Sequence, residues 1–431
     1  MKKPAQTAGD TRWFVHDRFG MFIHWGIYAL PARHEWVKHN EQIPDEAYQK
    51  YFDHFYPDLY DPHEWARMAR NAGMRYAVLT TKHHDGFCLW DSQYTDYKVT
   101  NTPWGKDLLG PYVEAFRSAG LHVGFYHSLI DWHHPQFPID GFHPMRAHPN
   151  AKEWNRTRDV RKYAAYLHNQ VRELLTQYGK IDIIFYDFSY SGARWPQWPH
   201  FRGKGKADWQ SERLIALTRD LQPGIIINNR TEIPQDIITP EQFQPIGWPT
   251  EGGQPKVWET CQTFSGSWGY HRDESTWKSP EQLIQMLINT VSCGGNLLMN
   301  VGPTARGTFD DRAVAALEVY ARWMRLHSRS IYGCTMSPFT PPRDCRYTQN
   351  GKLLYLHVYN WPFRHIYCPG LAGKVEYAQL LNDGSEIRMS GIPHGHEAVG
   401  LTEAQAKNML VLEVPVVKPN VTVPVIEMFL K

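Results

Sequence analysis

The sequence lacks the cysteine spacing of a zinc site or of a dense disulfide framework. Its six cysteines are scattered, and no two of them form a C-x-x-C pair. It also lacks a run of about 18 apolar residues that could cross a membrane, and residues 1–10 lack the apolar core of a signal peptide. We therefore expect a cytoplasmic protein with free thiols and no membrane segment, with secretion after removal of a signal as the open alternative.

An excess of charge of one sign is also missing. The 46 Lys and Arg residues are balanced by 44 Asp and Glu residues, and no basic cluster stands out. A nucleic-acid-binding surface needs a basic patch, so nucleic acid is not an expected partner. Aromatic residues and histidine are, in contrast, abundant, with 17 Trp, 23 Tyr and 22 His. Flat aromatic faces with polar edges suit a sugar ring, so the composition favours a carbohydrate-binding cleft.

Short apolar runs alternate with longer helical patterns over most of the chain. The apolar runs are residues 19–25, 75–81, 122–126, 181–187, 224–229, 257–261 and 296–301. The helical patterns are residues 61–71, 107–119, 155–178, 211–221 and 279–291. This alternation predicts parallel strands joined by crossover helices, in either a (β/α)8 barrel or a doubly wound sheet.

Polar residues follow directly on these runs and favour the barrel. They include His24, His83, His84, Asp187, Arg230, Glu259 and Asn300. The carboxyl ends of all strands meet at one mouth in a barrel, whereas an open sheet gathers a site only at its switch point. No G-x-G-x-x-G motif follows the first run. We predict an irregular (β/α)8-like barrel, with seven strands placed and the eighth not placed.

The pattern changes after a long amphipathic segment at residues 310–330. Asn350-Gly351 separates two β-rich segments, which is a strong hairpin signal, and further β-rich runs cover residues 409–417 and 421–429. We predict a catalytic barrel domain at residues 1–337 and a C-terminal β-sandwich domain at residues 338–431. This β-domain and the loop at residues 189–207 are candidate surfaces for a homo-oligomer.

The apolar run at residues 182–188 contains the carboxylate of Asp187, which is costly there unless it lies at the open end of a strand. A helix N-cap or a salt bridge would explain an isolated Asp. Glycosidic hydrolysis instead needs two carboxyl groups, and Asp187 on a rigid strand end suits the nucleophile. Glu241, on a long loop, and Glu259, interpreted as lying at a strand end, are the two candidates for the acid/base.

The histidines allow a metal-dependent hydrolase as an alternative. Adjacent residues of an extended segment point to opposite sides, so His83 and His84 could not both face one ion without a bulge or a bend. We therefore expect hydrogen bonds to hydroxyls and no metal or cofactor. A Ser/His/Asp triad has little support, because no G-x-S-x-G motif is present.

Several motifs together resemble the α-L-fucosidases of glycoside hydrolase family 29. They are FIHWG at residues 22–26, HEW at 34–36, TKHHDGF at 81–87, WGY at 268–270 and GGNLLMNVGP at 294–303. The resemblance implies a barrel followed by a β-sandwich, and retaining hydrolysis of terminal α-L-fucosyl residues from oligosaccharides or glycoconjugates through a covalent fucosyl–Asp187 intermediate. A fucose-binding, lectin-like protein on a glycosidase scaffold is the alternative.

The resemblance also implies a set of site residues. It favours Glu241 over Glu259 as the acid/base, because the family places this residue on the loop after the arginine-bearing strand. It implies that Trp268 packs against the methyl-bearing face of the sugar. Many relatives have Trp where this chain has Phe185, which keeps an aromatic face but loses the indole donor. The implied hydroxyl-binding residues are His24, Glu35, Trp36, His83, His84, Tyr126 and Arg230.

Overall fold

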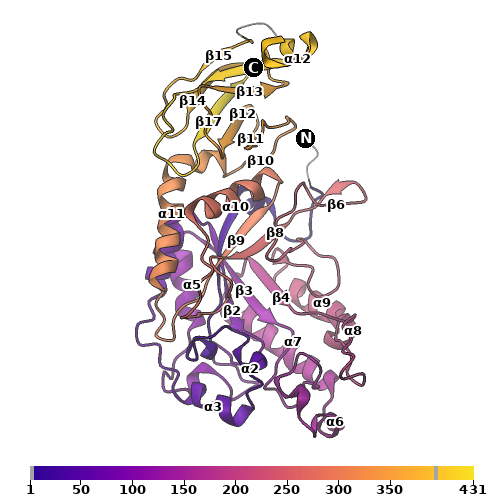
Figure 1. Ribbon diagram of the computed structural model, residues 1–431. Coiled ribbons are helices and arrows are strands. Elements are labelled where there is room, and N and C mark those ends of the chain that lie inside the picture. The colour runs from indigo at the N-terminus through magenta and orange to yellow at the C-terminus, as the bar shows by residue number, and fades with distance from the viewer. Residues whose placement is uncertain (1–3, 393–396) are drawn as a thin grey trace.

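The computed structural model describes residues 4–392 and 397–431 (Figure 1). Residues 1–3, part of the N-terminal stretch without signal-peptide features, lie outside the described residues. Seven parallel strands form one sheet in the order β5-β4-β3-β2-β1-β9-β8. The strands are β1 (Phe19–Ile23), β2 (Tyr76–Lys82), β3 (His122–Ser128), β4 (Ile183–Asp187), β5 (Ile226–Ile227), β8 (Glu259–Thr263) and β9 (Asn296–Val301).

An irregular segment takes the place of the eighth strand. Residues 237–241 bridge the two edge strands of the sheet through parallel pairs: Asn228 with Ile237 on the β5 side, and Glu241 with Cys261 on the β8 side. The predicted fold class is therefore confirmed. The missing strand could not be recognised in the sequence because this segment makes only isolated bridges and contains Pro240, which has no backbone N–H to donate.

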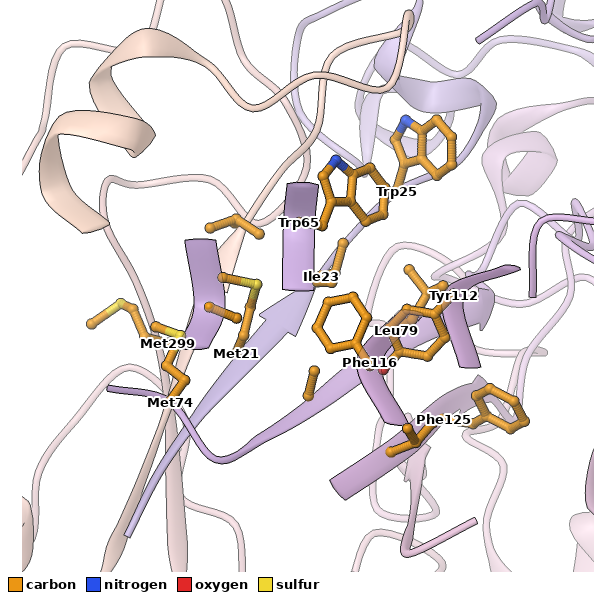
Figure 2. Close-up of a cluster of buried hydrophobic side chains, with 14 of the residues drawn as sticks. Met21, Ile23, Trp25, Trp65, Met74, Leu79, Tyr112, Phe116, Phe125 and Met299 are labelled. Atoms are coloured by element: carbon orange, nitrogen blue, oxygen red, sulfur yellow. The ribbon is translucent and has the colours of Figure 1, made fainter. Parts of the chain in front are cut away.

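The strands separate two sets of side chains by their alternating directions. On β1, Phe22 points to the concave face, while Met21 and Ile23 belong to the large core between the sheet and the helices. Figure 2 shows this outer core, where strand side chains meet Trp65 and Phe116 from two of the helices. All residues of β1, β2 and β4 are buried, as expected for parallel strands covered on one face and closed over on the other.

Helices follow most strands and cover the outside of the sheet (Figure 1). Asp61 caps α4 (Pro62–Asn71) by accepting from the N–H groups of His63 and Glu64, with Pro62 in the first turn. The predicted helix at residues 155–178 starts later, at Val160, behind the N-cap Asp159. The helices are α1 (Arg12–Asp17), α2 (Val37–Asn40), α3 (Asp45–Asp53), α4 (Pro62–Asn71), α5 (Leu109–Ser118), α6 (Ala151–Trp154), α7 (Val160–Gln177), α8 (Lys206–Trp209), α9 (Ser211–Leu221), α10 (Pro280–Ser292), α11 (Asp311–His327) and α12 (Glu403–Lys407).

The C-terminal part consists of two antiparallel sheets at one end of the molecule (Figure 1). The larger contains β10 (Thr335–Met336), β11 (Cys345–Asn350), β12 (Leu353–Val358), β17 (Val425–Leu430) and β14 (Val375–Leu380). The smaller contains β13 (His365–Pro369), β16 (Met409–Glu413) and β15 (Arg388–Ser390). Side chains from both sheets, such as Leu356 and Leu412, share one apolar cluster, which makes the pair a sandwich.

The predicted domain boundary, between residues 337 and 338, falls between the first two strands of the larger C-terminal sheet. The strand β10 already pairs with β11, although it ends just before the expected boundary between residues 337 and 338, so this boundary stays a prediction. A small hairpin of β6 (Thr250–Glu251) and β7 (Gln254–Pro255) interrupts the loop before β8. Within the described ranges, no helix is long and apolar enough to cross a membrane.

Candidate active site

A small cavity, partly open to solvent, lies at the carboxyl ends of the strands. Its position is the one at which barrel enzymes gather functional groups. The structure brings together here all the site residues named from the sequence except Glu259, and it adds Phe22, Phe188 and Cys261. The lining residues are Phe22, His24, Glu35, Trp36, His83, His84, Tyr126, Phe185, Asp187, Phe188, Arg230, Glu241, Cys261 and Trp268.

Asp187 is the last residue of β4 and is held by charge-assisted contacts. Its Oδ2 accepts a hydrogen bond of 2.8 Å from the Tyr126 hydroxyl, and its Oδ1 accepts one of 2.7 Å from Nη1 of Arg230. Burial by itself would raise the pKa of Asp187, but the charge of Arg230 and the hydrogen bonds from Arg230 and Tyr126 leave it lowered. Asp187 is therefore a fixed, ionised carboxylate, as a nucleophile requires.

Phe188 directly follows this carboxylate and adopts a strained backbone conformation. Its φ of 81° lies in the left-handed region, which costs a bulky residue about 1–3 kcal/mol. The ring packs against Trp36 and His84, with centroid distances of 5.2 and 4.7 Å, and these contacts offset part of the strain. No pattern in the sequence indicates a positive φ at a phenylalanine, so sequence reasoning missed this wall of the cavity.

Arg230 connects two carboxylates of the cavity, Asp187 and Glu241. Its Nε and Nη2 donate to the side chain and the carbonyl of Thr239, which orient the guanidinium. Its Nη1 lies 2.7 Å from Oδ1 of Asp187 and 2.6 Å from Oε2 of Glu241. Burial would lower the pKa of Arg230, but the neighbouring carboxylates raise it, so it remains charged. Glu241 is 41% exposed and reaches the cavity from the segment that bridges β5 and β8.

Glu259 lies elsewhere, and the interpretation that it lies at a carboxyl end of a strand was wrong. It is the first residue of β8, so two further residues of strand, roughly 7 Å, separate it from Cys261 in the cavity wall. Its Oε2 accepts a hydrogen bond from the hydroxyl of Tyr76, the first residue of β2. Burial raises the pKa of Glu259 to about 8. It lies at the amino end of the sheet, where burial favours its protonated form, and it does not line the cavity.

The histidine pair faces the cavity as a unit. Because β2 ends at Lys82, with a register shift against β3 just before it, His83 and His84 lie in a bend and their ring centroids are 4.0 Å apart. For both rings to face one point, the sequence required a bulge or a bend, and the chain has such a bend here. Burial lowers the pKa of His83 and of His84, the latter to about 3. Among residues 4–392 and 397–431, no group of three or more His, Cys, Asp or Glu side chains is placed to hold a metal ion.

Glu35 fixes a loop on the far side of the cavity. Its fully buried Oε2 accepts from the backbone N–H groups of Trp268 and Gly269, at 3.2 and 2.8 Å. Burial raises the pKa of Glu35. The loop is also close-packed beneath, because a Cβ on Gly302 would lie 2.6 Å from the backbone N of Tyr270. The contacts of Glu35 and Gly302 thus set the position of the Trp268 ring. The centroid of this ring lies 5.9 Å from that of Phe22.

The remaining cavity residues continue the apolar wall. Phe185 lies under the Arg230 guanidinium, which is 5.0 Å from its ring centroid, and stacks on Tyr126. Phe22 could have been found from the sequence, because it lies two residues before His24, which directly follows β1, and extended residues two apart share a face. Cys261 could have been found in the same way only if the start of β8 had been placed two residues later.

Comparison with known proteins agrees with this geometry. A family model described as alpha-L-fucosidase matches residues 2–329. The structure of alpha-L-fucosidase isoenzyme 1 from Paenibacillus thiaminolyticus is similar, with a TM-score of 0.89 at 43% identity over 98% of either chain. A trapped covalent intermediate of an alpha-L-fucosidase from Bacteroides thetaiotaomicron has a TM-score of 0.82 at 27% identity, over 100% of this chain and 98% of that one.

The similarity extends to animal proteins. Human plasma alpha-L-fucosidase is 28% identical over 391 residues, which cover 81% of this chain and 76% of that protein. The family model spans most of the chain and includes every residue of the cavity. The resemblance carried by the sequence motifs is thereby confirmed. This chain belongs to the alpha-L-fucosidase family, glycoside hydrolase family 29.

Proposed function

We propose that the protein is a retaining exo-α-L-fucosidase, with Asp187 as nucleophile and Glu241 as acid/base. One observation carries the proposal. Because Oδ1 of Asp187 and Oε2 of Glu241 contact the same nitrogen of Arg230, these oxygens are no farther apart than the sum of the two distances, about 5.3 Å. Retaining glycosidases hold their carboxyl groups about 5–5.5 Å apart, whereas inverting ones need roughly 6.5–9.5 Å to admit a water.

The two carboxylates divide the reaction into two displacements. In the first, an oxygen of Asp187 forms a bond to the anomeric carbon, the glycosidic C–O bond breaks, and Glu241 gives its proton to the leaving oxygen. In the second, water attacks the same carbon, its proton passes to Glu241, and Asp187 leaves as a carboxylate. Tyr126 and Arg230 stabilise the negative charge that returns to Asp187 in this step.

The cavity walls match a terminal deoxy sugar. Phe22 and Trp268 offer an apolar surface for a methyl group, while His24, His84 and Glu35 offer polar atoms for ring hydroxyls. A methyl group and a hydroxylated rim on one ring are the features of fucose. The cavity is small and partly open to solvent, so the proposed substrates are terminal fucosyl groups of oligosaccharides or glycoconjugates.

The test is the stereochemistry of the first product. We expect proton NMR of the hydrolysis of an aryl α-L-fucoside to show α-L-fucose first, before mutarotation. Initial formation of the β-anomer would refute the retaining assignment. Binding of fucose without hydrolysis of any fucoside would instead support a lectin-like protein on this scaffold.

A further inference from the structure

Two cavity histidines, His24 and His84, each use one ring nitrogen to bind a residue behind the cavity wall. Nδ1 of His24 lies 2.7 Å from Oδ1 of Asn300, on β9. Nδ1 of His84 lies 2.7 Å from Oγ of Ser128, the last residue of β3. Neither Asn300 nor Ser128 lines the cavity, so each can affect a bound sugar only through the cavity residues that it contacts.

The partner groups fix which nitrogen of His24 carries the proton. The side-chain amide of Asn300 donates a hydrogen bond of 2.6 Å from Nδ2 to the carbonyl oxygen of Trp268, which can only accept. Oδ1 of Asn300 is therefore the atom that faces His24, and it can only accept. Nδ1 of His24 must donate, and it carries the proton.

The same argument holds for His84 through a hydroxyl. Ser128 has one hydroxyl proton, and the carbonyl oxygen of Ile130, at 2.8 Å, can only accept it. Oγ of Ser128 therefore accepts from Nδ1 of His84 and also, at 3.1 Å, from the backbone N–H of Ile130. Burial lowers the pKa of His24 to about 4 and that of His84 to about 3, so a second proton is disfavoured on either ring at neutral pH.

We propose that Asn300 and Ser128 are positioning residues that lock His24 and His84 as Nδ1-protonated tautomers, so that each Nε2 accepts a proton from a sugar hydroxyl. For His84 the direction is visible, because its Nε2 lies 3.9 Å from Oδ2 of Asp187, on the nucleophile side of the cavity. A hydroxyl bound there donates to His84 and leaves Oδ1 and Oδ2 of Asp187 to their existing donors. The inference deepens the proposed function and rests on it for the identity of the sugar.

The lock also links separate parts of the site. Asn300 holds both His24 and the carbonyl of Trp268, and the N–H of Trp268 is held by Glu35. Three sugar-facing side chains from distant parts of the sequence are therefore tied to one another behind the wall. Such supporting contacts preserve the orientation of binding groups and are often as important as the groups themselves.

The tautomers can be read directly in the free protein. We expect long-range ¹H–¹⁵N correlation spectra of ¹⁵N-histidine-labelled protein to show unprotonated Nε2 and protonated Nδ1 for both rings, assigned by comparison with the His24→Gln and His84→Gln variants. A proton on Nε2 of either ring would overturn the proposal. This measurement needs no turnover, so it stands even when wild-type protein fails to hydrolyse any fucoside, which would refute the proposed function alone.

Kinetics test the acceptor role of His84. Ser128→Ala should lower kcat/KM for an aryl α-L-fucoside about tenfold, the size of one lost hydrogen bond, while Ser128→Thr, which keeps the hydroxyl, should retain most activity. Fluorine cannot donate, so this loss should disappear for the one deoxyfluoro analogue that lacks the hydroxyl facing His84. For each analogue, the kcat/KM of Ser128→Ala is divided by the kcat/KM of the wild type, which cancels the electronic effect of fluorine. An equal loss for the 2-, 3- and 4-deoxyfluoro analogues would show a merely structural role.

Discussion

The hydroxyl of Tyr126 donates a hydrogen bond of 2.8 Å to Oδ2 of Asp187, across neighbouring strands β3 and β4. Asp187 pairs with Ser128 in the strand register, and Tyr126 lies two residues earlier on the same strand. The two side chains point to the same face because residues two apart on a strand do so. Asp187, the proposed nucleophile, is thus positioned by the sheet itself as well as by Arg230.

Removal of this hydroxyl tests its contribution. Tyr126→Phe should lower kcat about 10- to 100-fold, because a hydrogen bond to a charged group is worth about 1.5–3 kcal/mol. The hydrogen bond helps to lower the pKa of Asp187, so its loss should move the acidic limb of the pH profile of kcat/KM to higher pH. Tyr112→Phe is the matched control, since its buried hydroxyl binds the carbonyl of Gly124 outside the cavity. An unchanged pH profile in Tyr126→Phe would contradict the argument.

Substitution of the two glutamates separates the candidates for the acid/base. Glu241→Ala should reduce hydrolysis of fucosides with poor leaving groups at least 10²-fold, the lower bound for general acid catalysis. Azide should restore turnover of activated aryl fucosides and give the α-L-fucosyl azide. Glu259→Gln should retain near-normal kcat, because this carboxyl lies at the amino end of the sheet. The reverse pattern would assign the role to Glu259.

Glu259 should instead influence stability as a function of pH. Its pKa is raised from 4.5 to about 8 in the fold, so the folded state binds a proton that the unfolded state releases more readily. Its contribution to stability is therefore complete below about pH 4.5 and is lost as the pH rises towards 8. Melting temperatures of wild type and Glu259→Gln should diverge in favour of the variant between pH 5 and 8, within this window. A constant difference across that range would show that Glu259 is ionised in the fold.

A glycine substitution tests the loop that carries Trp268. Gly302→Ala would place a Cβ within 2.6–2.8 Å of backbone atoms of Tyr270, Gly269 and Trp268, so this loop must shift. We expect KM to rise more than kcat falls, because Trp268 on this loop is a proposed sugar-binding residue with no part in the proposed proton transfer. Gly391→Ala, which has no atom within 4 Å of its added Cβ, is the control. Equal kinetics for the two variants would argue against a binding role for the loop.

The sequence predicted best those site residues that directly follow an apolar run, because this pattern is local in the chain. Asp187 was recognisable because burying a charge within an apolar run is costly unless the charge lies at the open end of a strand. The structure places Asp187 at the end of β4. The histidine motifs likewise lie at strand ends, where a barrel opens. Phe188 had no such signal, because its positive φ depends on contacts with Trp36 and His84 that lie far away in sequence.

The amino-acid sequence by itself determined the alternation of strands and helices and the polar residues at the strand ends, including Asp187. Apolar runs and the polar residues that end them are local properties of the chain. Only the tertiary structure decided the rest. Glu241 reaches Asp187 through Arg230, which lies 43 residues after Asp187 in the chain, and Glu259 is directed to the opposite end of the sheet by a shift of two residues in the start of β8. A strand start depends on hydrogen bonds to neighbouring strands, and the proton on a histidine depends on the group it meets; neither is encoded in the residue's own neighbourhood.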